Sequence, residues 1–96
     1  MSVNRKLLSP DEITNSTKNL PLWEVNGDKS LTRNFHFNNF IQAFAFMTKV
    51  AIVAETMSHH PEWRNVYADV EISLSTHDLG GISNLDLKLA KAIDEL

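Results

Sequence analysis

The amino-acid sequence predicts an α+β fold: a two-layer sandwich with helices packed on one face of an antiparallel sheet of about four strands. Apolar residues recur at helical spacing in three segments and alternate with polar residues in the segments between them. The resulting order is α-β-β-α-β-β-α. A chain of 96 residues has no room for two independent cores, so residues 1–96 are expected to form a single domain.

The first helix is predicted from its N-terminal signals. Ser9 and Glu12 have the spacing of a capping box, and Pro10 suits the first turn of a helix. Because the residue before a proline disfavours helical geometry, we expect this helix to end before Pro21.

A hairpin is expected next. Residues 22–25 and 31–37 are strand candidates on either side of Asn26-Gly27, a strong signal for a tight turn. Arg33 lies on the apolar face of the second strand. Patterning does not explain it, and both snorkelling at a sheet edge and pairing with an acid remain open.

A long helix is predicted from a cap at Asn38 or Asn39 to about Ser58. A helix that packs on one sheet needs an apolar stripe of only about 100°, whereas apolar residues cover about half of this helix. The surplus predicts a homodimer or homotetramer in which copies of the helix pack together, with an interface at a sheet edge also open. The residues expected in that interface are Phe46, Val50, Val53 and Met57, and a second stripe runs through Ile41, Ala45 and Ile52. The alternative is that the two other helices cover these side chains.

The C-terminal part alternates apolar and polar residues over 66–75, which favours one long strand and leaves open a reversal near Ala68-Asp69. Gly80-Gly81 then interrupts the chain. Ser83 and Asp86 form a second capping box, so a last helix is expected to begin there.

Composition excludes several classes of function. A net charge of −3 argues against nucleic-acid binding, which favours a basic face. The absence of cysteine excludes disulfides, a thiol nucleophile and cysteine-ligated zinc. Residues 1–8 carry no apolar segment of a signal peptide, and the apolar stretch 43–54 is too short to span a bilayer. We therefore expect a cytoplasmic protein.

Histidines mark the candidate site. His59 and His60 follow the long helix, and His77 follows the last strand. Taken singly, each has an ordinary structural explanation, such as a favourable position near a helix C-terminus. Together with a carboxylate, these histidines could catalyse a reaction in which one proton is added and another is removed near neutral pH. Glu55, one turn before His59, is the expected partner of that ring.

The segment from Glu55 to Tyr67 and the one from Ser75 to Asp86 carry a recognisable pattern. Its residues are Glu55, His59-His60-Pro61, Trp63, Asn65-Val66-Tyr67, Thr76-His77-Asp78, Gly80-Gly81, Ser83 and Asp86. The pattern resembles the signature of the pterin-4a-carbinolamine dehydratases, and the resemblance covers nearly the whole chain. It is weakest before Leu20.

The resemblance implies dehydration of 4a-hydroxytetrahydropterin to quinonoid dihydropterin, with neither metal nor cofactor. By position, the catalytic residues are His59, His60 and His77, with Glu55 and Asp86 as supporting acids. Pterin binding is implied for His59, His60, Pro61, Ser75, Thr76, His77 and Asp78. We expect His59 and His77 to form the acid–base pair and His60 mainly to bind substrate. A transcription-factor partner, with a nuclear location as well, is implied for some family members.

Two other functions stay open. Three histidines and a glutamate could ligate zinc, although adjacent His59-His60 is a poor chelate. The chain could instead be a dimerisation cofactor or coactivator-type binding protein on the same fold, without catalysis.

Overall fold

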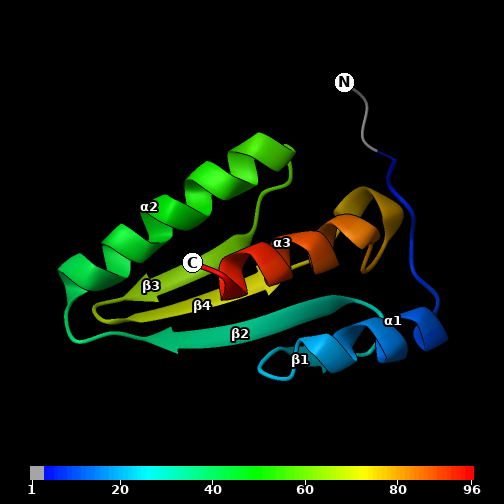
Figure 1. The fold of residues 1–96 in the computed structure, drawn as a ribbon, viewed down its shortest axis with the longest axis horizontal. Coiled ribbons are helices and arrows are strands. Elements are labelled where there is room, and N and C mark those ends of the chain that lie inside the picture. The colour runs from blue at the N-terminus through cyan, green and yellow to red at the C-terminus, as the bar shows by residue number, and fades with distance from the viewer. Residues whose placement is uncertain (1–3) are drawn as a thin grey trace.

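The computed structural model describes residues 4–96; residues 1–3, on which part of the signal-peptide expectation depends, lie outside it. The order α-β-β-α-β-β-α is confirmed (Figure 1). The elements are α1 (Pro10–Ser16), the 3-10 turn η1 (Thr17–Asn19), β1 (Glu24–Asn26), β2 (Ser30–His36), α2 (Phe40–Met57), β3 (Glu62–Val66), β4 (Asp69–Leu74), the 3-10 turn η2 (His77–Leu79) and α3 (Asn84–Asp94).

The four strands form one antiparallel sheet in the order β1-β2-β4-β3. Alternation along the strands gives the sheet one buried and one polar face. The side chains of β2 and β4 that are fully buried on the helix-covered face are Leu31, Val70, Ile72 and Leu74. They pack with residues of all three helices, including Ile13 of α1, Val50 of α2 and Leu89 of α3. The core therefore lies between the helices and one face of the sheet.

The expected helix caps are present. The capping box of Ser9 and Glu12 begins α1, and that of Ser83 and Asp86 begins α3. Asn39, one of the two candidates, caps α2 by accepting a hydrogen bond from the backbone N–H of Gln42 at 2.8 Å. Each side chain satisfies a backbone donor that the first helical turn leaves unpaired.

The long strand favoured for residues 66–75 is wrong, and the reversal left open near Ala68-Asp69 is present one residue earlier. The chain turns at Tyr67-Ala68, and β3 and β4 are separate strands. Tyr67 adopts a left-handed conformation with φ of 51°. The Asn65 side chain holds the turn by donating to the backbone carbonyls of Tyr67 and Asp69, both at 3.0 Å. A two-residue turn preserves the alternation of apolar and polar residues, so the sequence pattern does not show where the first strand ends.

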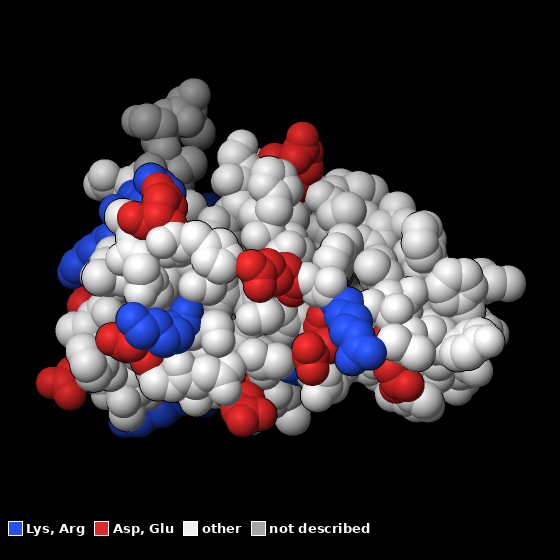
Figure 2. Space-filling view, turned by 180° about the vertical axis from the view of Figure 1, so that it is seen from behind, with Lys and Arg blue, Asp and Glu red and all other residues white. Residues whose placement is uncertain are grey.

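The faces of α2 are also assigned differently from the expectation. Val50 is fully buried, and Phe46, Val53 and Met57 pack against the core, so these residues face the sheet. The solvent-exposed apolar side chains are instead Ile41 and Ile52, at 79% and 62%, with Phe40 and Phe44. Seen from behind, the surface over α2 carries few charged side chains (Figure 2).

The apolar helix is longer than the stretch 43–54 on which the sequence expectation is based. With 18 residues and a mean hydropathy of 1.4, α2 is long and apolar enough to cross a membrane by length and composition alone. Helices that pack on the core of a soluble protein pass the same test. Here Ala43, Val50 and Ala54 are buried on the protein side of the helix.

Arg33 on the buried face of the sheet pairs with an acid, which was one of the two expectations. Its guanidinium lies 2.5 Å from the carboxylate of Asp94 and 4.3 Å from the centre of the Phe35 ring. Asp94 also accepts a hydrogen bond from Trp23 Nε1 at 2.8 Å. These contacts hold the C-terminal end of α3 on the sheet.

Candidate active site

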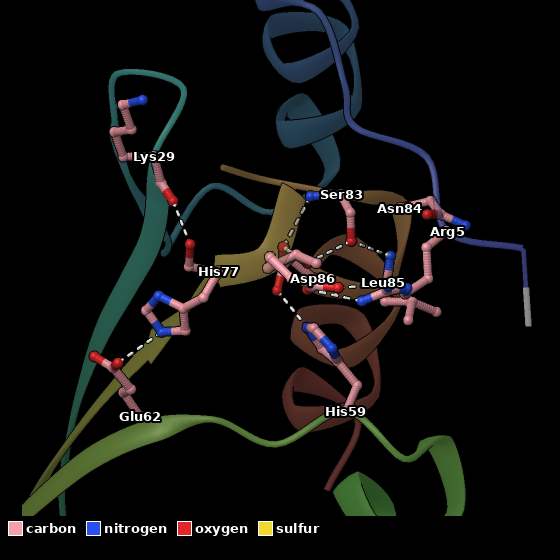
Figure 3. A network of polar contacts seen from close by, with 12 residues as sticks. Arg5, Lys29, His59, Glu62, His77, Ser83, Asn84, Leu85 and Asp86 are labelled. Carbon is pink, nitrogen blue, oxygen red and sulfur yellow. Dashed lines mark hydrogen bonds and ion pairs between the residues drawn. The ribbon is translucent and has the colours of Figure 1, made fainter. Parts of the chain in front are cut away.

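His59, which follows the C-terminus of α2, forms a buried pair with Asp86 (Figure 3). Ser58 ends the helix in a left-handed conformation with φ of 50°, which turns His59 inward. His59 is 9% exposed and Asp86 is fully buried, and His59 Nε2 lies 2.5 Å from Asp86 Oδ1. Because a carboxylate only accepts hydrogen bonds, His59 Nε2 carries the hydrogen in this contact.

The second oxygen of Asp86 organises the loop that carries the other candidate residues. Oδ2 accepts from the backbone N–H of Ser83 and from Thr76 Oγ1, each at 2.8 Å. Thr76 Oγ1 also lies 2.6 Å from Ser83 Oγ. Buried polar groups are costly unless they are paired, and here the carboxylate has three donors. Asp86 therefore couples His59 to the residue that precedes His77.

The loop of residues 75–83 is fixed at further points. Ser75 Oγ donates to the backbone carbonyl of Lys29 at 2.7 Å, and Thr76 N donates to the carbonyl of Gly81 at 2.8 Å. A Cβ at Gly81 would lie 2.5 Å from the carbonyl oxygen of Asp28, so only glycine fits this close approach without a shift of the backbone.

His77 contacts an acid that the sequence analysis did not single out. Its Nε2 lies 2.7 Å from Oε1 of Glu62 at the start of β3, and both side chains are about 70% exposed, at 72% and 70% (Figure 3). Antiparallel pairing of Glu62 with Ser73 places the start of β3 beside the end of β4. The reversal at Tyr67-Ala68 brings Glu62 to the end of β4. A single strand over residues 66–75 does not predict this contact.

His60 and Glu55 form a third pair, with His60 Nε2 2.8 Å from Glu55 Oε1. The expectation that Glu55 orients His59 is therefore wrong, because His59 turns inward to Asp86. His60, Pro61 and Trp63 line a cleft of about 740 Å³ whose other wall is the C-terminal half of α2. Apolar side chains of α2, among them Ala51 and Ile52, face this cleft.

Asp78 is held by the N-terminal segment. Arg5 makes two contacts with its carboxylate, at 2.8 and 2.6 Å. The hydrogen bond from Arg5 lowers the pKa of Asp78 below its usual value, with a further contribution from the positive charge. Asn84 anchors the same segment by accepting from Lys6 N and donating to the carbonyl of Asn4, each at 2.8 Å.

The predicted site residues thus form separate contacts rather than one cluster. His59, Thr76 and Asp86 share one buried network, whereas His60 and His77 each pair with an exposed glutamate. Within residues 4–96, no group of three histidine or acidic side chains is arranged to hold a metal ion. The arrangement provides three imidazoles, each oriented by a carboxylate, which is suited to general acid–base chemistry near neutral pH.

Comparison with known proteins agrees with the sequence pattern. Residues 6–96 match the profile of the family described as pterin 4 alpha carbinolamine dehydratase. A Prochlorococcus marinus protein provisionally named pterin-4-alpha-carbinolamine dehydratase is 56% identical over 94 residues, covering 98% of this chain and 97% of that protein. A Synechococcus protein of the same provisional name is 52% identical over 90 residues, covering 94% and 96%.

Two solved structures share the fold. A protein of Brucella melitensis described as a transcriptional coactivator/pterin dehydratase superposes with a TM-score of 0.87 at 37% identity, over 94% of this chain and 97% of that one. A pterin dehydratase-like protein described as a RuBisCO assembly factor of the alpha-carboxysome superposes with a TM-score of 0.63 at 24% identity, over 76% and 86%, which shows the fold alone. The match over residues 6–96, the close relatives and the shared fold together show that the chain belongs to the pterin-4-alpha-carbinolamine dehydratase family.

Proposed function

We propose that this protein dehydrates 4a-hydroxytetrahydropterin to quinonoid dihydropterin in the cytoplasm, by histidine acid–base catalysis without metal or cofactor. Family membership supports the reaction class. The observation that carries the mechanism is the buried His59–Asp86 pair, coupled through Thr76 to the loop that bears His77. A buried imidazole held by a fully buried carboxylate is a preorganised proton-transfer group.

In the proposed reaction, the bond between C4a and its hydroxyl oxygen breaks while N5 loses its hydrogen. One imidazolium protonates the departing oxygen, which leaves as water, and a neutral imidazole takes the N5 proton. The nitrogen lone pair forms the C4a–N5 double bond. His59 and His77 supply the two proton transfers, and His60 binds substrate. Such catalysis is typically worth about 10²- to 10⁴-fold.

Substrate is held, in this proposal, by His60 with Pro61 and by the loop from Ser75 to Asp78. That loop is tied to the turn between β1 and β2 at Lys29, to α3 at Asp86 and to the N-terminal segment at Arg5. A rigid loop keeps the reacting groups in place without ordering them at each turnover.

Stopped-flow measurement of 4a-hydroxytetrahydropterin breakdown, with and without the protein, tests the activity. We expect the protein to accelerate breakdown over the buffer reaction in proportion to its concentration. A rate equal to that of buffer alone would reject the proposal. Dialysis against a strong chelator is expected to leave rate and melting temperature unchanged; loss of rate that zinc restores would favour the metal site instead.

A second candidate function rests on the Brucella melitensis relative, whose description includes transcriptional coactivator. A coactivator-type role would use a protein-binding surface rather than the histidines. Alanine at His59 and His77 separates the two functions, because it is expected to abolish dehydration and leave protein binding intact.

A further inference from the structure

Glu62 and His77 approach each other at the end of the sheet, on the loop proposed to bind substrate. Their side chains are 2.7 Å apart, although the residues belong to different elements and both are largely exposed (Figure 3). Glu62 belongs neither to the predicted catalytic set nor to the expected supporting acids.

The backbones of both residues are fixed. Glu62 is paired with Ser73 in the sheet, and the preceding Pro61 restricts its own φ. On the other side, Thr76 is held by Asp86 and by Gly81, and the carbonyl of His77 accepts a hydrogen bond from Gly80 N at 3.0 Å. Anchored backbones leave only side-chain torsions to be ordered when Glu62 contacts the His77 ring.

The contact also selects an atom of the ring. A carboxylate has no hydrogen to donate, so Nε2 of His77 carries the hydrogen that Glu62 accepts. Nδ1 is then the nitrogen left to exchange a proton with a bound molecule.

We propose that Glu62 is a positioning residue for the dehydration: it holds the His77 ring in one orientation and leaves Nδ1 as its proton-exchanging atom. The kinetic consequence rests on the proposed function, whereas the orientation of the ring does not. Because a contact between two exposed side chains stabilises one orientation of the ring only modestly, the expected effect on rate is about two- to fivefold.

The test compares Glu62→Ala and Glu62→Gln with wild type, by steady-state kinetics and by NMR relaxation of the His77 ring carbons. We expect Glu62→Ala to lower kcat about two- to fivefold with KM nearly unchanged, and to lower the order parameter of the ring. Glu62→Gln retains an acceptor oxygen and is expected to restore part of both. Asp69→Ala is the matched control, since it removes the exposed carboxylate 2.6 Å from His36 at the far end of the sheet. It should loosen His36 and leave kcat unchanged.

The two readouts separate failure of this inference from failure of the proposed function. An inactive wild type would reject the dehydratase proposal, and the ring order parameters would still report on Glu62. An active wild type with unchanged kcat in Glu62→Ala would overturn the positioning role. Ring order that is the same in Glu62→Ala and wild type would overturn it as well.

Discussion

Nε2 of His59 and Oδ1 of Asp86 lie 2.5 Å apart, although 27 residues separate the two in the chain. Asp86 holds this imidazole with one oxygen while its other oxygen completes the capping box of α3. Capping alone, the role that the sequence pattern indicates for Asp86, does not account for the first contact. One buried carboxylate therefore links the start of a helix, the loop before His77 and the ring of His59.

Replacing Asp86 with asparagine is expected to impair stability and turnover together. The carboxylate accepts hydrogen bonds on both oxygens, whereas an amide has only one acceptor oxygen. Its NH₂ group must then face either the His59 ring or the donors at Thr76 and Ser83. An unsatisfied buried group costs about 1–3 kcal/mol.

Urea denaturation and single-turnover kinetics of Asp86→Asn measure the two effects. Ser9→Ala is the matched control, because it removes a capping side chain at α1, away from the histidines. It should cost about 1 kcal/mol and leave turnover intact. If Asp86→Asn behaves in the same way as Ser9→Ala, the carboxylate is only a cap.

Alanine at His59 or at His77 is expected to lower the dehydration rate about tenfold or more, because each change removes a proton-transfer partner. Circular dichroism checks that the fold persists. His36 is a closely matched control, since it is also an exposed histidine paired with a carboxylate, Asp69. Equal losses from His36→Ala and His77→Ala would contradict the assignment.

Acid is expected to weaken the attachment of the N-terminal segment. The pKa values of Glu12 and Asp78 are both lowered: Glu12 chiefly by the backbone N–H of Ser9, and Asp78 chiefly by its hydrogen bond from Arg5. At pH values between the lowered folded pKa values and the ordinary carboxyl pKa, the unfolded chain therefore binds more protons than the folded one. The stabilisation is present above the ordinary carboxyl pKa of about 4 and is lost as pH falls through the lowered folded values.

Melting temperatures between about pH 7 and pH 2.5 measure this effect. Arg5→Ala removes the main cause of the low pKa of Asp78, so its melting temperature should fall less steeply with acid than that of wild type. Lys18→Ala is a charge-matched control, because Lys18 contacts the amide of Asn15 rather than an acid. Identical acid slopes for Arg5→Ala and wild type would contradict the prediction.

Local signals in the sequence predicted most of the fold because each depends on a few neighbouring residues. The caps at Ser9 and Ser83 and the turn at Asn26-Gly27 are of this kind. The sequence does not require the reversal at Tyr67, because neither Tyr67 nor Ala68 is a typical turn residue and the alternation of apolar residues continues across it.

The partners within the site were harder to predict than its residues. Spacing of four residues favoured Glu55 as the partner of His59, but the left-handed Ser58 breaks the helical geometry on which that spacing depends. The pairs Glu62–His77 and Arg5–Asp78 join residues far apart in the chain, and only the tertiary fold brings them together.

Assembly is expected to depend on the exposed stripe of α2 rather than on the side chains first predicted. Ile41 and Ile52 are 79% and 62% exposed, with Phe40 and Phe44 exposed on the same helix. Soluble monomers rarely leave a contiguous apolar patch of this kind in water. We propose that two or four copies of the chain bury it in a symmetric interface.

Ile41→Glu and Ile52→Glu place charge in that interface and should shift the particle to a smaller species, as measured by light scattering. Lys49→Glu, at an exposed charged position of the same helix, is the control and should leave the particle size unchanged. Phe46→Glu and Val53→Glu should instead destabilise the monomer, because both side chains pack on the core. A monomeric wild type at micromolar concentration would end the proposal, since the stripe would then be exposed in the native protein without a partner copy.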